Sequence, residues 1–239
     1  MTKELFRDDS YLQSCEATVT RVGEDFFCTD QTVFYALGGG QPGDTGSVTC
    51  NGNQTTIVDT RYGDDGDICH FVATGSAIPE VDSRVELQLD WQRRYLHMRM
   101  HTAMHLLGSI LKYDVTGGNI SAAKSRLDFN MEDSVDKEAV GNALAALVDA
   151  NHPVSCRWIS EQELDANPGL VRTMSVQPPR GKGAIRLLEI EDVDLQPCGG
   201  THVRSTAEVG AVRVGKVENK GRQNRRVNIH IDDPQQAQS

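Results

Sequence analysis

The sequence contains no long apolar run. Only 38% of its 239 residues are hydrophobic and 24% are charged, a composition typical of folded soluble proteins. No stretch approaches the ~20 consecutive apolar residues of a membrane-spanning helix, so we expect no membrane partner. The amino terminus, MTKELFRDDSYL, is charged and lacks an apolar segment, which excludes a secretory signal. A cytoplasmic location is therefore expected.

The cysteines lack the regular spacing of a disulfide framework. Six are present, at positions 15, 28, 50, 69, 156 and 198. In a reducing cytoplasm, such scattered cysteines stay as thiols. We expect five of them simply to pack, whereas Cys198 lies in a motif of its own.

Basic residues are scarce in the first part of the chain. The formal net charge is -10, but residues 1–90 hold 16 acidic and 5 basic side chains, whereas residues 91–239 hold 18 acidic and 19 basic ones. The stretch VRVGKVENKGRQNRR, residues 212–226, carries six basic side chains and one acidic one. It predicts either a local basic face for an anionic partner or a solvated pair of strands.

Length and turn spacing predict an α+β protein with two domains, residues 1–90 and residues 91–239. Between residues 15 and 90, short β-branched runs alternate with Gly, Asn and Asp turns. This alternation is typical of a small antiparallel barrel. Its strands are expected at 15–22, 32–37, 55–60, 68–73 and 84–90.

The second part is predicted to mix helices with an antiparallel sheet. Apolar spacing predicts a long helix over 95–113, and a second helix over 134–150 with Ser134 as its cap. A short helix over 161–167 should end at Pro168. Further strands are expected at 119–131, 154–160, 184–190, 209–218 and 225–231.

Two histidines in the long helix form half of a predicted metal site. In HTAMHLL, residues 101–107, His101 and His105 are four positions apart, so both imidazoles lie on one helix face. A pair of this kind, taken alone, is as often a packed or solvated face. His97 lies on the same stripe, but about 12 Å of helix rise separates it from His105. Because arginines flank His97, we expect it at the surface.

The stretch QPCGGTHV, residues 196–203, supplies the other half of the site. Cys198 and His202 flank a Gly-Gly pair that lets the backbone turn both side chains toward one point. Three histidines and one cysteine are ligands that suit Zn²⁺. Four protein ligands favour a structural ion, whereas catalytic zinc usually keeps one position open. The motifs leave this choice open.

These motifs belong to an ordered series that covers nearly the whole chain. The series resembles the free-standing alanyl-tRNA editing proteins, which are relatives of the editing domain of alanyl-tRNA synthetase and, more distantly, of threonyl-tRNA synthetase. The chain departs from the family at Ala36, where the family usually has proline. This change should make a turn less rigid, but it removes no reactive side chain. The matching segments are FYALGGGQPGDTG (34–46), HTAMHLL (101–107), SRLDF (125–129), GLVRTMSV (169–176), PPRGKGAIRLLEI (178–190), DLQPCGGTHV (194–203) and KVENKGRQNRR (216–226).

The resemblance implies a zinc-dependent hydrolase that removes a wrongly attached amino acid, chiefly serine and secondarily glycine, from tRNA(Ala). The bond cleaved joins the amino acid to the terminal ribose, and its hydrolysis uses no ATP. The implied fold is a translation-factor-like barrel followed by an α+β editing domain. Because the chain has no room for an activation domain, we expect it to act in trans on tRNA charged elsewhere. The implied zinc ligands are His101, His105, Cys198 and His202.

A glycine-rich loop gives a second expected contact with the substrate. The backbone at Gly39 and Gly40 can approach the tRNA end or close the pocket, and Gln41 adds a side chain that donates and accepts hydrogen bonds. A tight turn in the barrel explains the same glycines. The loop is not a P-loop, because no Lys-Ser/Thr pair follows it.

Recognition of a serine hydroxyl requires polar groups near the zinc. We expect them among Asn119, Ser121 and Asp128, although an ordinary polar turn and a strand acid account for these residues equally well. Contacts with tRNA phosphates are expected from Arg180, Lys182, Arg222, Arg225 and Arg226.

Two rival functions fit the same motifs. In the first, zinc only stabilises an RNA-binding module that has no catalytic activity. In the second, the protein hydrolyses small esters or amides at zinc, and the basic stretch near the carboxyl terminus is incidental.

Overall fold

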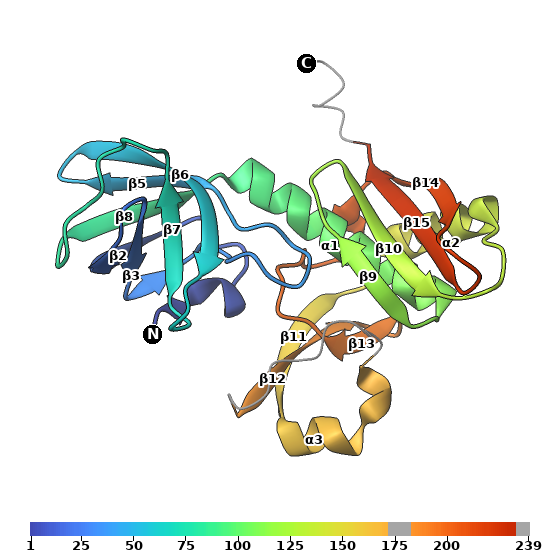
Figure 1. The fold of residues 1–239 in the computed structure, drawn as a ribbon. Helices are drawn as coiled ribbons and strands as arrows, with labels where there is room; N and C mark the ends of the chain where they lie inside the picture. Colours follow the sequence, from blue (N-terminus) through green and yellow to red (C-terminus); the bar gives the residue numbers. More distant parts are fainter. Residues whose placement is uncertain (172–182, 233–239) are drawn as a thin grey trace. The chain divides into compact units, whose positions relative to one another are not determined.

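A computed structural model describes residues 1–171 and 183–232 of the chain (Figure 1). The protein is α+β, as predicted, and its contacts divide it into two compact units, Met1–Tyr95 and Leu96–Ser239. The domain boundary expected at residue 90 remains a prediction. Within the described ranges, no helix is both long and apolar enough to cross a membrane.

The first unit contains the predicted antiparallel barrel. Six strands close it in the order β2-β3-β7-β6-β5-β8, and a short parallel pair, β1 with β4, accompanies them. The bounds are β1 (Lys3–Glu4), β2 (Ser14–Val22), β3 (Phe26–Thr29), β4 (Gln31–Thr32), β5 (Gly46–Cys50), β6 (Asn53–Tyr62), β7 (Ile68–Val72) and β8 (Arg84–Leu89). The sequence did not predict β1, β3 or β5.

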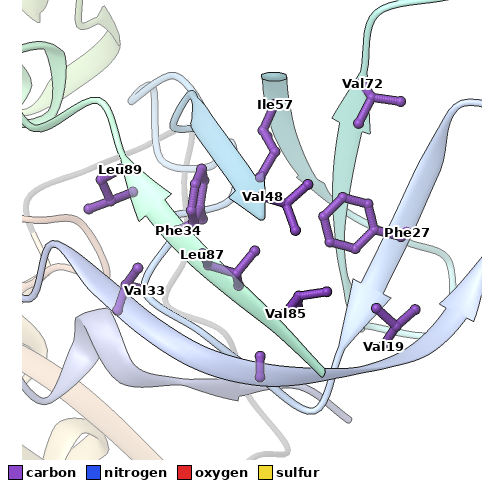
Figure 2. Close-up of a cluster of buried hydrophobic side chains, with 11 residues drawn as sticks. Val19, Phe27, Val33, Phe34, Val48, Ile57, Val72, Val85, Leu87 and Leu89 are labelled. Atoms are coloured by element: carbon purple, nitrogen blue, oxygen red, sulfur yellow. The ribbon is translucent and has the colours of Figure 1, made fainter. Parts of the chain in front are cut away.

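Side chains that alternate along the strands fill the barrel. In β8, Val85, Leu87 and Leu89 are buried while the residues between them are exposed, which is the period of a strand with one face in a core. Figure 2 shows these side chains pointing toward the same interior as Phe27 and Phe34. Burial of each such side chain contributes about 1.5–3 kcal/mol, so the barrel has a core of its own.

The strand predicted over residues 32–37 is wrong beyond Thr32. Residues 33–36 are buried but form no strand. Tyr35 donates its N–H to the Asp44 carboxylate at 2.6 Å, and Leu37 donates its N–H to the carbonyl of Thr60. A short apolar run indicates burial, but it does not reveal whether its backbone pairs with a strand or with a side chain.

The expectation that five cysteines pack is wrong for one of them. Cys28 and Cys69 are fully or almost fully buried, and their sulfur atoms lie 3.3 Å apart on paired strands. Cys15 and Cys50 pack against the barrel core. Cys156, however, is exposed, on a strand at the edge of a sheet.

The barrel contains a buried histidine with two hydrogen-bond partners. His70 is fully buried. Its Nδ1 lies 3.3 Å from the carbonyl of Phe27, and its Nε2 lies 2.8 Å from the Thr32 hydroxyl. A neutral imidazole satisfies both contacts by donating from Nδ1 and accepting at Nε2. Burial lowers the pKa of His70 to about 4, so the folded protein favours the neutral form.

We therefore expect acid to destabilise the protein through His70. Between pH 6.5 and pH 4 the unfolded chain binds the proton and the folded chain does not, so stability falls as the pH falls, by about 3 kcal/mol in total. Urea unfolding at pH 7.5, 6, 5 and 4 measures this slope in the wild type and in His70→Gln. The substitution should flatten the profile in this window. Parallel profiles of the two proteins would contradict the prediction.

The second unit contains two antiparallel sheets and the helices that pack with them. Four strands follow the order β14-β15-β10-β9 and three follow the order β11-β12-β13. The strand bounds are β9 (Val115–Asn119), β10 (Lys124–Asn130), β11 (Val154–Ser160), β12 (Ala184–Ile190), β13 (Asp194–Pro197), β14 (Val212–Asn219) and β15 (Asn224–Ile231). The sequence did not predict β9 or β13.

The three predicted helices are present, but the first two begin at other residues than expected and the first ends at residue 111 and not at 113. Helix α1 (Trp91–Leu111) begins before residue 95, because the Asp90 carboxylate accepts the N–H of Arg93 at 3.1 Å and so caps the first turn. Helix α3 (Glu161–Ala166) ends just before Pro168, as predicted.

Helix α2 (Lys137–Asp149) is capped by Asp136 and not by Ser134. The Asp136 side chain accepts the N–H groups of Glu138 and Ala139, each at 3.0 Å. Both residue types are good caps. The position of the first helical turn therefore decides between them.

Candidate metal centre

The two predicted half-sites meet in the second unit. Helix α1 presents His101 and His105, while Cys198 and His202 come from the segment that follows β13. One ligand atom from each of the four residues lies within 4.8 Å of the other three. The Cys198 sulfur lies 3.5 Å from Nε2 of His101 and 3.5 Å from Nε2 of His202. The four side chains therefore converge on one point.

The segment with Cys198 and His202 is held in place from two sides. The Cys198 N–H donates to the carbonyl of Arg186, and the buried Arg186 guanidinium donates back to the carbonyls of Cys198 and Gly200 at 3.0 and 2.9 Å. On the side of α1, the buried Thr102 hydroxyl accepts the N–H of Val203 at 3.3 Å. A chain segment without regular structure is thus fixed against both the sheet and the helix.

The two sulfur–nitrogen distances in the group match those of a tetrahedral metal site. A tetrahedral ion with a metal–sulfur distance of ~2.3 Å and a metal–nitrogen distance of ~2.0 Å separates sulfur from nitrogen by about 3.5 Å. Both distances from the Cys198 sulfur equal this value. Cys198 is also the least buried of the four residues. Solvent therefore reaches the group most easily beside Cys198.

The second nitrogen of His105 contacts a buried carboxylate. Nδ1 of His105 lies 3.1 Å from Oδ2 of Asp194, and the side-chain nitrogen of Gln196 lies 2.9 Å from the same Nδ1. An Nδ1–H that donates to Asp194 leaves the lone pair of Nε2 for a metal, which is a common arrangement around ligating histidines. Asp194 and Gln196 alternate along β13 and so share a face, and Cys198 follows directly after the strand. Only the strand register reveals this, and the sequence analysis missed Asp194.

The electrostatics of the group favour a bound cation. Burial alone raises the pKa of Cys198, but His101 and His202 outweigh burial and hold the pKa well below its usual range. Burial alone lowers the pKa of His105, but its hydrogen bonds with Asp194 and Cys198 raise that pKa to about 10. Burial lowers the pKa of His202 to about 3. A thiolate therefore stands beside a His105 ring whose surroundings favour positive charge, so the group attracts a cation.

The expected surface position of His97 is wrong. His97 is 2% exposed, and it is not a member of the four-residue group. Flanking arginines suggested a solvated face, but Arg94 is itself fully buried because it forms an ion pair with Asp44. An arginine indicates the surface only when it has no buried carboxylate to pair with.

The glycine-rich loop is a tight turn in the first unit. Gly38 and Gln41 exchange backbone hydrogen bonds, and Gly39 and Gly40 between them have φ values of 56° and 82°, a region that favours glycine. Both glycines are exposed at the tip, but Gln41 is fully buried. The backbone at the tip is therefore exposed, whereas the side chain of Gln41 is buried, and a contact of this loop with the substrate stays a prediction.

The three residues predicted to recognise a hydroxyl differ in their surroundings. Asp128 accepts two hydrogen bonds from Arg226, each at 2.8 Å, and it also pairs with Arg126. The Ser121 hydroxyl donates to the carbonyl of Lys124 at 2.5 Å. Asn119, at the end of β9, is exposed. Their role toward the substrate stays a prediction.

The residues predicted to contact phosphates also differ. The Arg222 side chain is 90% exposed. Arg225 donates to backbone carbonyls, among them that of Gly221 at 3.0 Å, and so holds the turn between β14 and β15. Arg226 is engaged by Asp128. Two further predicted residues, Arg180 and Lys182, lie outside the described residues.

Comparisons with known proteins agree with the motif series. Residues 185–228 match the family described as threonyl and alanyl tRNA synthetase second additional domain, and residues 5–93 match class II (A) tRNA synthetases. The alanyl-tRNA editing protein AlaX-M of Methanosarcina acetivorans is 34% identical, covering 95% of this chain and 98% of that protein. AlaX-M of Saccharolobus solfataricus is 32% identical with the same two coverages, 95% and 98%. The alanine–tRNA ligase of Pyrobaculum aerophilum is 35% identical over 91% of this chain but over only 25% of the ligase. The chain therefore belongs to the alanyl-tRNA editing protein family, as its motifs predicted.

Proposed function

We propose that this protein is a trans-editing hydrolase that deacylates mischarged tRNA(Ala), chiefly tRNA carrying serine and secondarily tRNA carrying glycine, at a zinc ion. The observation that supports it most is the convergence of His101, His105, Cys198 and His202 in a chain that is similar over almost its full length to alanyl-tRNA editing proteins. Zinc suits this set because one thiolate and three imidazoles are borderline to soft donors.

The ester between an amino acid and ribose is already reactive, so modest catalysis is sufficient. Bound zinc supplies a Lewis acid that polarises the ester carbonyl or lowers the pKa of a nearby water. The protein's own residues position that ion. His101, His105 and His202 would hold it from the buried side, where Asp194 lies against His105, and Cys198 would hold it at the most accessible edge. The substrate therefore approaches beside the cysteine.

Serine is distinguished from alanine by its hydroxyl. A pocket that hydrogen-bonds this hydroxyl leaves its own polar groups unpaired when the substrate has a methyl group instead, which favours hydrolysis of the serine ester. Among the three predicted residues, Asn119 is the strongest candidate because it is exposed. Ser121 and Asp128 already use their side chains in contacts within the sheet and its turn.

The tRNA is expected to bind through its phosphates in the second unit. The exposed Arg222 is the described residue best suited to this contact, and Arg180, Lys182, Arg225 and Arg226 complete the proposed set. Because phosphate binding releases counterions, the affinity for tRNA should fall as the salt concentration rises.

Purified protein incubated separately with serylated and alanylated tRNA(Ala) tests the proposed function. We expect release of serine and little release of alanine, and we expect Cys198→Ala to abolish the release. Cys50→Ala is the matched control, because Cys50 is a partly buried cysteine in the barrel. Metal content measured on each variant should fall only for Cys198→Ala.

Each alternative gives a different result in the same experiment. Equal release of serine and alanine would reject the specificity. Binding of tRNA with no release of either would favour a non-catalytic RNA-binding module, in which four protein ligands fully coordinate a structural zinc. Salt-insensitive hydrolysis of free esters would favour a small-ester hydrolase.

A further inference from the structure

An exposed tryptophan lies on the same sheet as the metal centre. Trp158, on strand β11, is 50% exposed. Among the described residues from 96 onward, no other large hydrophobic side chain is comparably exposed. The next residue, Ile159, points to the opposite face, where it is buried in a cluster with Leu164 and Leu187. The opposite face therefore anchors the strand, and Trp158 has no apolar cover among the residues that the structure describes.

The strand register places Trp158 and the metal ligand Cys198 on one face. Trp158 pairs directly with Arg186 of β12. Cys198 continues the β12–β13 register, since Leu187 pairs with Pro197 and the Cys198 N–H donates to the carbonyl of Arg186 at 3.1 Å. Residues directly opposite one another in a sheet point to the same side. Trp158, Arg186 and Cys198 thus form one row across three neighbouring chain segments.

A second row supports the same orientation. Cys156 pairs with Leu188, and Leu188 pairs with Gln196, whose side chain reaches His105. The middle residue of each row is buried, with Leu188 at 0% and Arg186 at 6% exposure. On this face, the end of each row that lies toward β13 contacts the metal centre. The other end of each row, Cys156 or Trp158 on β11, is exposed.

The separation suits one nucleoside. Two inter-strand spacings of ~4.8 Å put the Cα atoms of Trp158 and Cys198 about 10 Å apart. In an aminoacyl-tRNA, a single ribose separates the ester from the terminal adenine. The distance from ester to base is therefore similar to the distance between these two residues. A flat, solitary indole also fits one base better than a protein partner, because stable protein interfaces bury roughly 1,200–2,000 Å².

We propose that Trp158 is the stacking surface for the terminal adenine of the tRNA whose ester lies at the metal centre. This inference rests on the proposed function for its ligand. Base stacking on an aromatic side chain is tolerant of sequence and changes affinity by about 5- to 100-fold per base. The small thiol of Cys156 beside the indole leaves room for the ring of the base.

Tryptophan fluorescence tests the subsite without hydrolysis. The chain has two tryptophans, so Trp91→Phe leaves Trp158 as the only strong fluorophore. An uncharged RNA that ends in CCA should quench this fluorescence, whereas the same RNA without its terminal adenosine should quench it much less. Equal quenching by both RNAs, or no quenching by either, would overturn the inference.

Kinetics with seryl-tRNA(Ala) give the second readout. Trp158→Ala should raise KM by about 5- to 100-fold with little change in kcat, and Trp158→Phe should restore most of the loss. A small serine ester without a nucleoside should be hydrolysed equally well by all variants. An unchanged KM in Trp158→Ala would count against the subsite. Adenosine-dependent quenching in a protein that hydrolyses nothing would keep the subsite and reject the proposed function.

Discussion

Asp194→Asn is expected to weaken metal binding by about 10- to 100-fold. The Asp194 carboxylate lies 3.1 Å from Nδ1 of His105, and it is the buried charge that holds the proton on this nitrogen. An asparagine keeps the size of the side chain but loses the charge that strengthens His105 as a ligand. Removal of a partner behind a ligating histidine typically costs this much affinity. Competition with a chromophoric chelator measures the constant directly.

A neighbouring acid provides the matched control for this experiment. Asp192 is exposed and has a φ of 60°, a conformation that asparagine also tolerates. Asp192→Asn removes one negative charge from the same hairpin without touching His105. We expect its metal affinity to equal that of the wild type. Equal affinities for all three proteins would show that Asp194 does not support the site.

The grouping of the four candidate ligands could be predicted because each half-site is local. His101 and His105 are neighbours on any regular helix, and Cys198 and His202 are separated only by a short flexible segment. Their chemistry favours the same ion, so the two halves could be joined without knowledge of the fold. The strands of the barrel were predicted where alternation is regular, as in β8, where every second residue is buried.

The features that the sequence did not reveal depend on long-range pairing. Asp194 acts on a histidine 89 positions away, and only the register of β13 brings its carboxylate to that ring. Cys28 and Cys69 have no informative spacing, but β3 and β7 place them opposite each other. Trp158 lies in no recognisable sequence motif. Its position on the same face as Cys198 follows only from the pairing of β11 with β12 and of β12 with β13.

Arg94 shows why charge alone misled the prediction of the surface. It lies in the first unit, and its side chain is fully buried beside Asp44. Its Nε lies 2.9 Å from Oδ2 of Asp44, and its other nitrogens donate to the carbonyls of Ser10 and Val33 at 3.0 and 2.7 Å. The guanidinium thus satisfies groups from three separate segments of the barrel unit. Because Asp44 also accepts the N–H of Tyr35, this ion pair fixes the loop before the glycine-rich turn.

Arg94→Met should destabilise the protein by about 3–5 kcal/mol, because it leaves the Asp44 carboxylate buried without a counter-charge. Urea unfolding of the wild type and the variant measures the loss. The double variant Arg94→Met with Asp44→Asn should recover part of it, since the remaining group is then neutral. Arg93→Met is the matched control, because Arg93 is only partly buried and its guanidinium donates to a backbone carbonyl. We expect this control to lose about 1 kcal/mol. If Arg94→Met and Arg93→Met lose the same stability, and the second substitution recovers nothing, the barrel does not depend on the ion pair.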